Sequence, residues 1–422
     1  MVTILINTGT ELMLGRVLNT HQQWLCRQLA DLGYTVSRQL ALPDTAQEIV
    51  QAIRQALAEA DLIVTTGGLG PTSDDVTRDL IAQTLGRKLR EDPAVLANLQ
   101  AFFATRRRRI PDRVRLQAQV PEGALVLPNL HGTAPGLAIE VSPNLARPGH
   151  HPAWIVMLPG PPRELRPMFL DTVVPLLRRV LPPPEAFACR TLSSLGLGES
   201  LVEERLCAAL EKSLADGLEL GYCARPGQVD VRLVCRGPNA ETTVRAAQEI
   251  VRIELGEHIY SDGEQELEEV VLRLLTARGQ TLALAESCTG GLLAHRLTNV
   301  PGASAVLLAG LVSYSNQAKR EFLGVDAETL ARHGAVSEPV AREMAEGARG
   351  KTGADYALAI TGIAGPGGGT ADKPVGTVFI GLAGPFQTVV TRNLNAWDRE
   401  TFKQVTTDQA LDLLRLRLIR GS

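Results

Sequence analysis

The 422-residue sequence contains few aromatic residues and no long apolar segment. Phe, Trp and Tyr make up 4% of the chain, so no aromatic series is present on which nucleic-acid bases could stack. No apolar run reaches the length of a membrane-spanning helix, and the first residues, MVTILINTGTEL, lack the charged region of a signal peptide. We therefore expect a cytoplasmic protein that has no membrane partner.

The sequence also lacks a strong net charge and a metal-binding cysteine pattern. The formal net charge is −3, and the single basic run, Arg106–Arg109, is interpreted as a solvated helix end, so we expect no direct contact with nucleic acid. None of the six cysteines forms a CxxC pair, and the seven histidines show no zinc-ligand spacing. Free thiols of this kind are typical of a reducing compartment.

Lysine is scarce: it supplies only six of the 43 lysine and arginine residues. Most surface positions accept either basic residue, but the guanidinium group of arginine does not deprotonate in proteins. A chain that prefers arginine still needs lysine wherever a side chain must give up a proton. Lys319 is one of the six.

The first 175 residues alternate strand and helix patterns, which predicts an α/β fold with a doubly wound, mainly parallel sheet. The predicted strands and helices are 3–7, 20–32, 35–42, 45–59, 61–70 and 153–162. Glycine-rich segments follow several of these strands, at the sheet edge where ligands of such folds bind. Asp74 or Asp75 is placed to cap the helix that follows.

The sequence predicts two further domains after residue 175. A proline-rich segment, RVLPPPEA, links to a small α+β domain at residues 185–260. The strand–helix alternation resumes in a C-terminal α/β domain at residues 263–418. There we expect strands at 281–286 and 354–362, a long buried strand at 305–315, a helix at 289–300 and a closing helix at 397–418.

The segment AESCTGG, residues 285–291, lies where a strand becomes a helix. Ser287 is well placed there as a nucleophile, and the unpaired N–H groups of such a turn can hold an oxyanion or a phosphate. The alternatives are that Ser287 only caps the helix or that Cys288 is the nucleophile. No histidine is an obvious base, whereas Lys319 follows a buried strand and can be partly desolvated; it can also be an ordinary surface lysine. Thr361 ends a third strand.

AESCTGG, YSNQAK, GAVSEPVA, ITGIAGPGGG and KPVGTV together resemble the C-terminal domain of the CinA family, in family order over residues 263–418. The resemblance implies a nicotinamide mononucleotide deamidase, an activity also found alone as the PncC enzyme, that needs no cofactor. It implies Ser287 as nucleophile, Lys319 as base, and Tyr314 and Thr361 in the catalytic set. The substrate-binding residues that it implies are Glu286, Thr289, Gly290, Gly291, Asn316, Gly362, Gly365 and Arg399. Gly367 stands where family members often carry Asp.

A second set of segments lies near the N-terminus: GTELMLGRVLNTH, TTGGLGPTSDDVTRD, GTAPG and LPGPPRELRPM. Glycine turns after strands suit a phosphate or pyrophosphate, and Asp74 with Asp75 can hold a bridging divalent cation or merely cap a helix. These segments resemble the N-terminal domain of full-length CinA, which shares the molybdopterin-binding fold of MoaB and MogA. The resemblance implies a metal-dependent ADP-ribose pyrophosphatase. The site residues that it implies are Glu11, Asn19, Gly67, Gly68, Asp74, Asp75 and Gly160.

Both resemblances imply a bifunctional enzyme of pyridine-nucleotide recycling. One site would hydrolyse nicotinamide mononucleotide to nicotinic acid mononucleotide and ammonia, and the other would hydrolyse ADP-ribose to AMP and ribose 5-phosphate. The alternatives are a molybdopterin- or nucleotide-binding N-terminal module without turnover, and a competence or DNA-damage interaction protein. We expect a homodimer.

Overall fold

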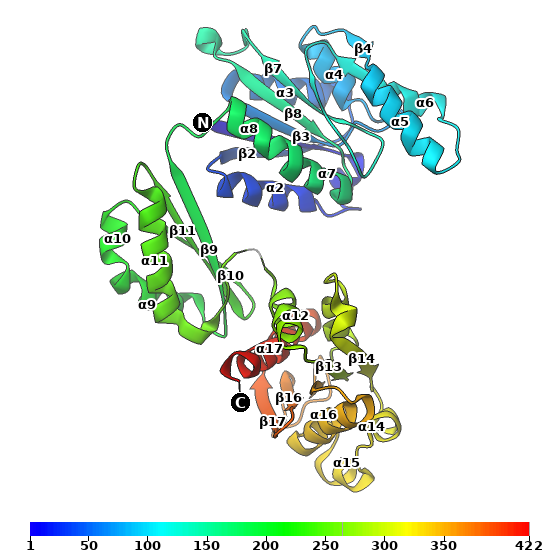
Figure 1. The fold of residues 1–422 in the computed structure, drawn as a ribbon, viewed down its shortest axis with the longest axis vertical. Helices are drawn as coiled ribbons and strands as arrows, with labels where there is room; N and C mark the ends of the chain where they lie inside the picture. The colour runs from blue at the N-terminus through cyan, green and yellow to red at the C-terminus, as the bar shows by residue number, and fades with distance from the viewer. Residues whose placement is uncertain (264, 422) are drawn as a thin grey trace. The chain divides into compact units, whose positions relative to one another are not determined.

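A computed structural model describes residues 1–263 and 265–421; residue 264, inside the expected domain 263–418, lies outside the described residues. The described chain divides into two compact units (Figure 1). One unit is Met1–Cys189 with Arg236–Ala240, and the other is Arg190–Cys235 with the chain from Glu241 onward. None of the helices in the described chain is both long enough and apolar enough to cross a membrane.

The first unit contains a six-stranded sheet in the order β2-β1-β3-β8-β7-β6. The first four strands in that order are parallel, and β7 and β6 join them antiparallel. The strands are β1 Val2–Thr8, β2 Thr35–Leu42, β3 Leu62–Thr66, β6 Leu125–Leu127, β7 Gly136–Val141 and β8 Ala153–Leu158, and a separate ribbon pairs β4 Leu89–Glu91 with β5 Gln119–Pro121. The sheet is therefore mainly parallel, as the sequence predicts.

Helices cover both faces of this sheet (Figure 1). One apolar cluster packs α3, α4 and α5 against one face, and a second packs α2, α7 and α8 against the other. The helices are α1 Thr10–Met13, α2 Thr20–Asp31, α3 Ala46–Glu59, α4 Thr77–Thr84, α5 Pro93–Thr105, α6 Asp112–Arg115, α7 Pro162–Met168 and α8 Val174–Val180. This arrangement confirms the doubly wound fold class.

A smaller α+β segment follows in the chain. Its sheet has the order β10-β11-β9-β12, with β10 and β11 forming an antiparallel hairpin. The elements are β9 Phe187–Leu195, α9 Glu199–Ala209, α10 Glu211–Ala215, β10 Glu219–Arg225, β11 Gln228–Arg236, α11 Ala240–Leu255 and β12 Ile259–Ser261.

The last part of the second unit is a five-stranded sheet in the order β14-β13-β15-β16-β17. Strands β14, β13 and β15 are parallel, and β16 and β17 continue the sheet antiparallel. The strands are β13 Leu282–Glu286, β14 Leu307–Val312, β15 Tyr356–Gly362, β16 Thr377–Ala383 and β17 Thr388–Leu394. The helices are α12 Leu267–Arg278, α13 Leu292–Thr298, α14 Asn316–Leu323, α15 Ala327–His333, α16 Glu338–Thr352 and α17 Arg399–Arg420.

Successive residues of β13 and β15 point to opposite faces and build two different cores. Leucines and isoleucines of these strands pack with α12, α13 and α17, whereas alanines of the same strands face α14, α15 and α16. Small side chains let α16 approach the sheet closely. A Cβ atom on Gly381 would lie 2.6 Å from the carbonyl oxygen of Ala341 in α16, so only glycine fits there.

The expectation of a long buried strand at 305–315 is wrong. Strand β14 is shorter and lies at the sheet edge, and its residues alternate between partly buried and exposed. Leu308 and Val312 are about half exposed. An apolar sequence run predicts burial, but the strand order that places β14 at an edge depends on long-range pairing.

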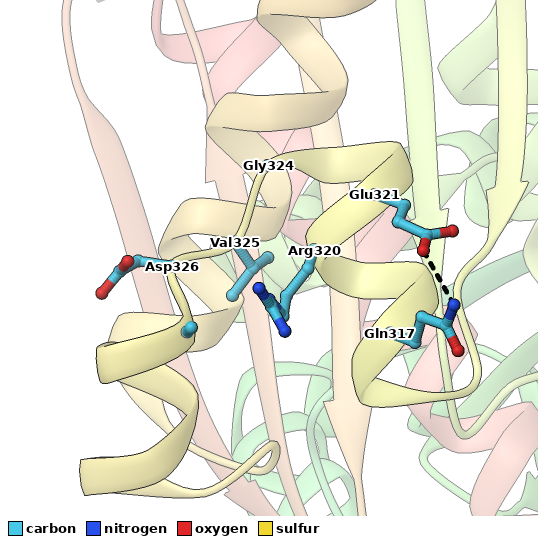
Figure 2. A pocket seen from close by; sticks show the side chains of 7 residues that line it. Gln317, Arg320, Glu321, Gly324, Val325 and Asp326 are labelled. Atoms are coloured by element: carbon cyan, nitrogen blue, oxygen red, sulfur yellow. Dashed lines mark hydrogen bonds between the residues drawn. The ribbon is translucent and has the colours of Figure 1, made fainter.

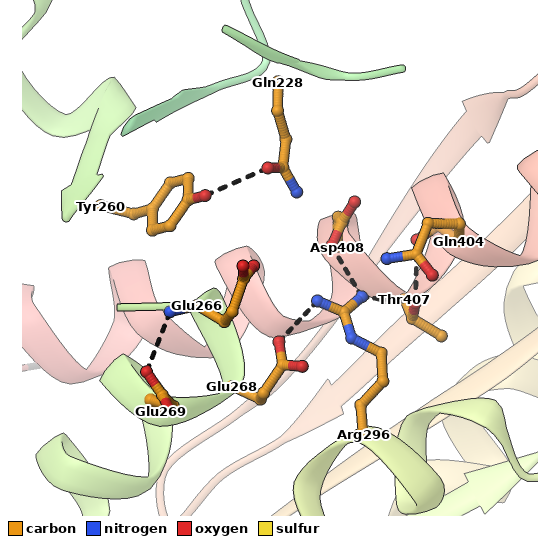
Figure 3. A network of polar contacts seen from close by, with 9 residues as sticks. All are labelled: Gln228, Tyr260, Glu266, Glu268, Glu269, Arg296, Gln404, Thr407 and Asp408. Carbon is orange, nitrogen blue, oxygen red and sulfur yellow. Dashed lines mark hydrogen bonds and ion pairs between the residues drawn. The ribbon is translucent and has the colours of Figure 1, made fainter. Parts of the chain in front are cut away.

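A buried ionic network ties α12, α13 and α17 together (Figure 3). The guanidinium group of Arg296 donates to Glu268 at 2.7 Å, Asp408 at 2.7 Å and the Thr407 hydroxyl at 2.8 Å. Burial raises the pKa of Asp408, and the charge of Arg296 opposes that rise. Because Arg296 and Asp408 are both nearly inaccessible, the loss of one partner would leave a buried uncompensated charge.

Candidate functional site

Three loops meet at the carboxyl edge of the C-terminal sheet, because β13, β14 and β15 run parallel. Ser287 directly follows β13, and its N–H donates to the carbonyl oxygen of Ile360 in β15 at 3.0 Å. Ser313 directly follows β14, and its N–H donates to the Glu286 carbonyl oxygen at 2.8 Å. These bonds hold the three strand ends in register, so polar residues that are far apart in sequence adjoin one another.

Ser287 and Lys319 are in direct contact. The Lys319 Nζ atom lies 2.9 Å from Ser287 Oγ, and it also donates to the carbonyl oxygens of Ser313 at 2.7 Å and Tyr314 at 3.4 Å. Lys319 is 1% exposed although it begins from the short helix α14. Its amine is therefore shielded from solvent and contacts the nucleophile candidate from inside the protein.

The surroundings of Lys319 favour its neutral form. Burial lowers the pKa of the ammonium group below its usual value of 10.5, and a small opposing effect comes from Cys288. No carboxylate contacts the Nζ atom among the described residues; its partners are a hydroxyl and two carbonyl groups. An amine that loses its proton more easily can accept one from a serine hydroxyl.

Cys288 lies beside Ser287 but is poorly suited to be a nucleophile. Its side chain is buried, and desolvation raises the pKa of the thiol to about 12. A thiol with that pKa stays protonated near neutral pH, and the thiolate is the reactive form. The geometry therefore favours Ser287 between the two neighbouring candidates.

The sequence predicts that Glu286 binds the substrate, but the structure places its carboxylate inside the protein. Its carboxylate is 1% exposed and accepts the N–H groups of Gly291 at 3.0 Å, Leu293 at 3.1 Å and Ala294 at 2.8 Å. It thus satisfies the N-terminus of α13, which removes the need for Ser287 to act as a helix cap. The helix also begins later than expected, because Gly290 and Gly291 adopt positive φ angles.

The glycine turn leaves few main-chain donors free. The Gly290 N–H donates to Ser287 and the Gly291 N–H donates to Glu286, so these two groups cannot also cradle a phosphate. Within the described part of the chain, the N–H groups of Cys288 and Thr289 donate to no oxygen atom and interact only with the Cys288 sulfur. They belong to the two residues that follow Ser287, where an oxyanion would form. Thr289 itself is fully buried, and its hydroxyl lacks a hydrogen-bond partner.

Arg399 connects two loops at the rim of the site. One guanidinium nitrogen donates to the Gly365 carbonyl oxygen at 2.8 Å, and another donates to the Tyr314 hydroxyl at 3.0 Å. Tyr314 is exposed, and so is Asn316, the first residue of α14. These residues form an accessible polar rim outside the buried pair of Ser287 and Lys319.

Thr361 and Gly362 have structural contacts. The Thr361 hydroxyl donates to the carbonyl oxygen of Ala335 at 2.8 Å, which fixes the loop that precedes α16. A Cβ atom on Gly362 would lie 2.9 Å from the Thr377 carbonyl oxygen. Thr361 directly follows Ile360, the β15 partner of Glu286, but its hydroxyl proton is donated to Ala335 and not to the site.

The sequence reasoning missed Lys403 in this site. Its Nζ atom lies 4.0 Å from the position that a Cβ atom on Gly290 would occupy. Lys403 is one helical turn after Arg399, so both side chains extend from the same face of α17 toward the loops. The scarcity of lysine in the sequence marks Lys403 as a candidate. It could not be assigned to this site, because the contact between the terminal helix and the turn joins residues that are far apart in sequence.

The N-terminal candidate residues surround a cavity of about 380 Å³. Of the predicted residues, Glu11, Gly67, Gly68, Asp74, Asp75 and Gly160 line it. Gly68 must lack a side chain, because a Cβ atom there would lie 2.0 Å from the Thr77 hydroxyl oxygen. Asn19 is not among the lining residues; its side chain accepts from the Gln22 N–H at 3.2 Å and caps α2.

Carboxylates dominate the polar lining of this cavity. Besides the predicted acids, Asp44 and Glu164 line it, and the sequence reasoning missed both. Asp44 accepts from the Thr10 N–H at 2.8 Å, and Glu164 accepts from the Asn129 side chain at 2.8 Å. Such a lining repels a bare pyrophosphate but suits one that arrives with a hard divalent cation, which prefers oxygen ligands.

Asp74 and Asp75 do not cap α4, whose N-cap residue is Val76. Instead Thr72 binds both: its hydroxyl donates to Asp74 and to Asp75 (2.5 Å), and its N–H donates to Asp75 at 2.9 Å. The Thr72 hydroxyl lowers the pKa of Asp74, which keeps this carboxylate ionised. No group of three metal-ligating side chains is preassembled in residues 1–263 or 265–421, so a cation would need oxygens from its substrate.

A separate hollow of about 650 Å³ lies on the outer side of α14, toward α15 (Figure 2). Gln317, Arg320 and Glu321 line it, and the Gln317 side chain donates to Glu321 at 2.8 Å. Lys319 is not among its lining residues. Neither Ser287 nor Lys319 lines the hollow, which is therefore distinct from the strand-end site.

Comparisons with known proteins match the whole chain. Family models match the CinA C-terminal domain at residues 264–418, a probable molybdopterin binding domain at residues 4–179, and the damage-inducible protein CinA KH domain at residues 189–261. A CinA-like protein of Akkermansia muciniphila is 43% identical over 410 residues, which cover 96% of this chain and 95% of that protein. A CinA-like protein of Kosmotoga olearia is 40% identical over 418 residues, covering 98% of each chain.

A solved structure is also similar to part of the chain. The crystal structure of the competence damage-inducible protein A from Klebsiella pneumoniae is 42% identical and covers 37% of this chain and 97% of its own, with a TM-score of 0.36.

Proposed function

The chain belongs to the CinA family, and from that premise we propose that residues 263–418 form a nicotinamide mononucleotide amidase. The observation that carries the proposal is the 2.9 Å contact between Ser287 Oγ and the buried amine of Lys319. An amide hydrolase needs a nucleophile and a base that exchanges one proton with it. This pair supplies both without a histidine.

In the proposed reaction, neutral Lys319 takes the hydroxyl proton of Ser287 while Oγ attacks the carboxamide carbon. The resulting oxyanion accepts hydrogen bonds from the N–H groups of Cys288 and Thr289. The C–N bond then breaks as Lys319 returns the proton to the leaving nitrogen, which departs as ammonia. Water then attacks the remaining ester while Lys319 accepts one of its protons. As the ester C–O bond breaks, Lys319 passes that proton to Ser287 Oγ, and the acid product leaves as its carboxylate after losing its own proton to water.

We further propose that residues 1–175 hydrolyse the pyrophosphate of ADP-ribose. The acidic cavity supports this assignment, because its carboxylates suit a substrate that binds together with a divalent cation. Asp74 and Asp75 would hold the cation, which when bound would neutralise phosphate charge and lower the pKa of a water molecule. The Thr72 hydroxyl positions both carboxylates.

The second candidate for the N-terminal domain is a molybdopterin- or nucleotide-binding module without turnover. The match to a probable molybdopterin binding domain favours it. A competence or DNA-damage interaction is a further alternative, suggested by the names of the relatives. The test of enzyme against binder is whether ADP-ribose is consumed and whether added metal is required.

The experiment that tests the proposed function identifies products from the purified full-length chain. With nicotinamide mononucleotide we expect equal amounts of nicotinic acid mononucleotide and ammonia without added metal. With ADP-ribose we expect AMP and ribose 5-phosphate only when a divalent cation is present. Consumption of neither compound would overturn both assignments, and consumption of one would leave the other domain as a binding module.

A further inference from the structure

We propose that Lys403 binds the substrate phosphate and makes the C-terminal site prefer a nucleotide to the corresponding nucleoside. This inference rests on the amidase proposed above and names the group that selects its substrate class. Lys403 belongs to α17, and its Nζ atom lies beside Gly290 in the nucleophile turn, 4.0 Å from the Cβ position there. It therefore places a positive charge at the site without contacting Ser287 or Lys319.

The main-chain donors at the starts of α13 and α17 are already used, so these two helix starts cannot hold a phosphate. Glu286 occupies the N–H groups at the start of α13, and the Gly290 N–H is bonded to Ser287. The start of α17 is also closed, because the Asp398 side chain accepts the Glu400 and Thr401 N–H groups. A phosphate held between these two helix starts is therefore recognised by side-chain cations.

Two cations are available on one face of α17. Arg399 is partly committed, since it donates to the Gly365 carbonyl oxygen and to Tyr314. The Lys403 ammonium makes no hydrogen bond or ion pair within the described chain, although its side chain is half-buried. Both extend toward loops that carry glycines, where a phosphate can approach closely.

The buried carboxylate of Glu286 makes the role of Lys403 more specific. A negative charge under the turn repels a phosphate dianion, and a cation beside Gly290 opposes that repulsion. The pyridinium ring is cationic in both the nucleotide and the riboside, so it gains no attraction from Lys403 and does not distinguish the two. The loss of Lys403 should therefore weaken binding of a phosphorylated substrate and leave an unphosphorylated one unaffected.

The test compares nicotinamide mononucleotide with nicotinamide riboside, which lacks only the phosphate. We expect Lys403→Met to lower kcat/KM for the nucleotide by about 10- to 100-fold, mainly through KM, because one charge-assisted hydrogen bond is lost. The slow reaction of the riboside should stay unchanged, and Lys403→Arg should recover most of the nucleotide activity. Lys351→Met, which removes an exposed lysine on α16, serves as the matched control.

Each other outcome decides the inference. An unchanged KM for the nucleotide, or equal losses for nucleotide and riboside, would overturn it, since a merely structural role affects both. If the wild type hydrolyses neither compound, the amidase proposal fails, and the role of Lys403 is then tested by binding alone. Calorimetry would measure the affinity for nicotinamide mononucleotide of Ser287→Ala and of the double variant Ser287→Ala/Lys403→Met. An affinity about tenfold weaker in the double variant supports the inference, whereas equal or undetectable affinities overturn it.

Discussion

The substitution Glu286→Gln tests whether this carboxylate supports the nucleophile turn or contacts a substrate. The carboxylate accepts three main-chain N–H bonds of 2.8 to 3.1 Å. A glutamine oxygen can accept two of them at most, and its amino group would face the third N–H. We expect a loss of about 2–4 kcal/mol in local stability, from one charge-assisted bond and the interaction with the helix N-terminus.

Hydrogen exchange followed by mass spectrometry would measure this effect on the full chain. We expect the amides of residues 287–298 to exchange about 30- to 1,000-fold faster in Glu286→Gln, with the rest of the protein unchanged. Glu346→Gln, which changes an exposed glutamate of α16, is the control. Unchanged protection together with a raised KM for nicotinamide mononucleotide would refute the structural role and restore the substrate contact.

Three further perturbations address the base, the buried network and the metal. Since burial lowers the pKa of Lys319, kcat/KM for the amidase should rise with pH and level off above that pKa, which lies below 10.5. Lys319→Arg should be inactive at every pH, and a flat profile for the wild type would contradict this. Arg296→Met should lower the free energy of unfolding, measured by chemical denaturation at neutral pH, by about 3–5 kcal/mol. The loss should be smaller at acidic pH, because Asp408, whose pKa is raised by burial, then becomes neutral. Equal losses at both pH values would contradict this prediction. Asp74→Asn should raise the metal concentration needed for ADP-ribose hydrolysis at least tenfold and leave ammonia release unchanged; an unaltered metal requirement would remove Asp74 from the site.

The fold could be predicted because its signals are local. Strand–helix alternation and glycine turns identified the doubly wound sheet, and parallel strand ends predicted that the loops after 286, 315 and 362 would meet. These loops do meet, although the second one begins at residue 313. Strand order was less accessible, since β14 is an apolar run that lies at an edge. Pairing partners depend on contacts between distant residues, which periodicity does not encode.

The sequence predicted the two central residues of the candidate site, but not the roles of the residues around them. Ser287 and Lys319 follow parallel strands, so their meeting follows from topology. Glu286, Asn19 and Thr361 carry the same chemistry as binding residues, and only their hydrogen-bond partners reveal that they support the local fold. Lys403 was missed because it lies on α17, 113 residues after Gly290, and such a long-range contact leaves no local signal in the sequence.

The most direct test of the central claim is ammonia release from nicotinamide mononucleotide by the wild type, Ser287→Ala and Lys319→Met. The account predicts that the wild type releases ammonia and that both folded variants lose at least a hundredfold in kcat, because each removes half of the pair. Full activity in Ser287→Ala would contradict the account, because the reaction would then proceed without the hydroxyl group that we assign as the nucleophile.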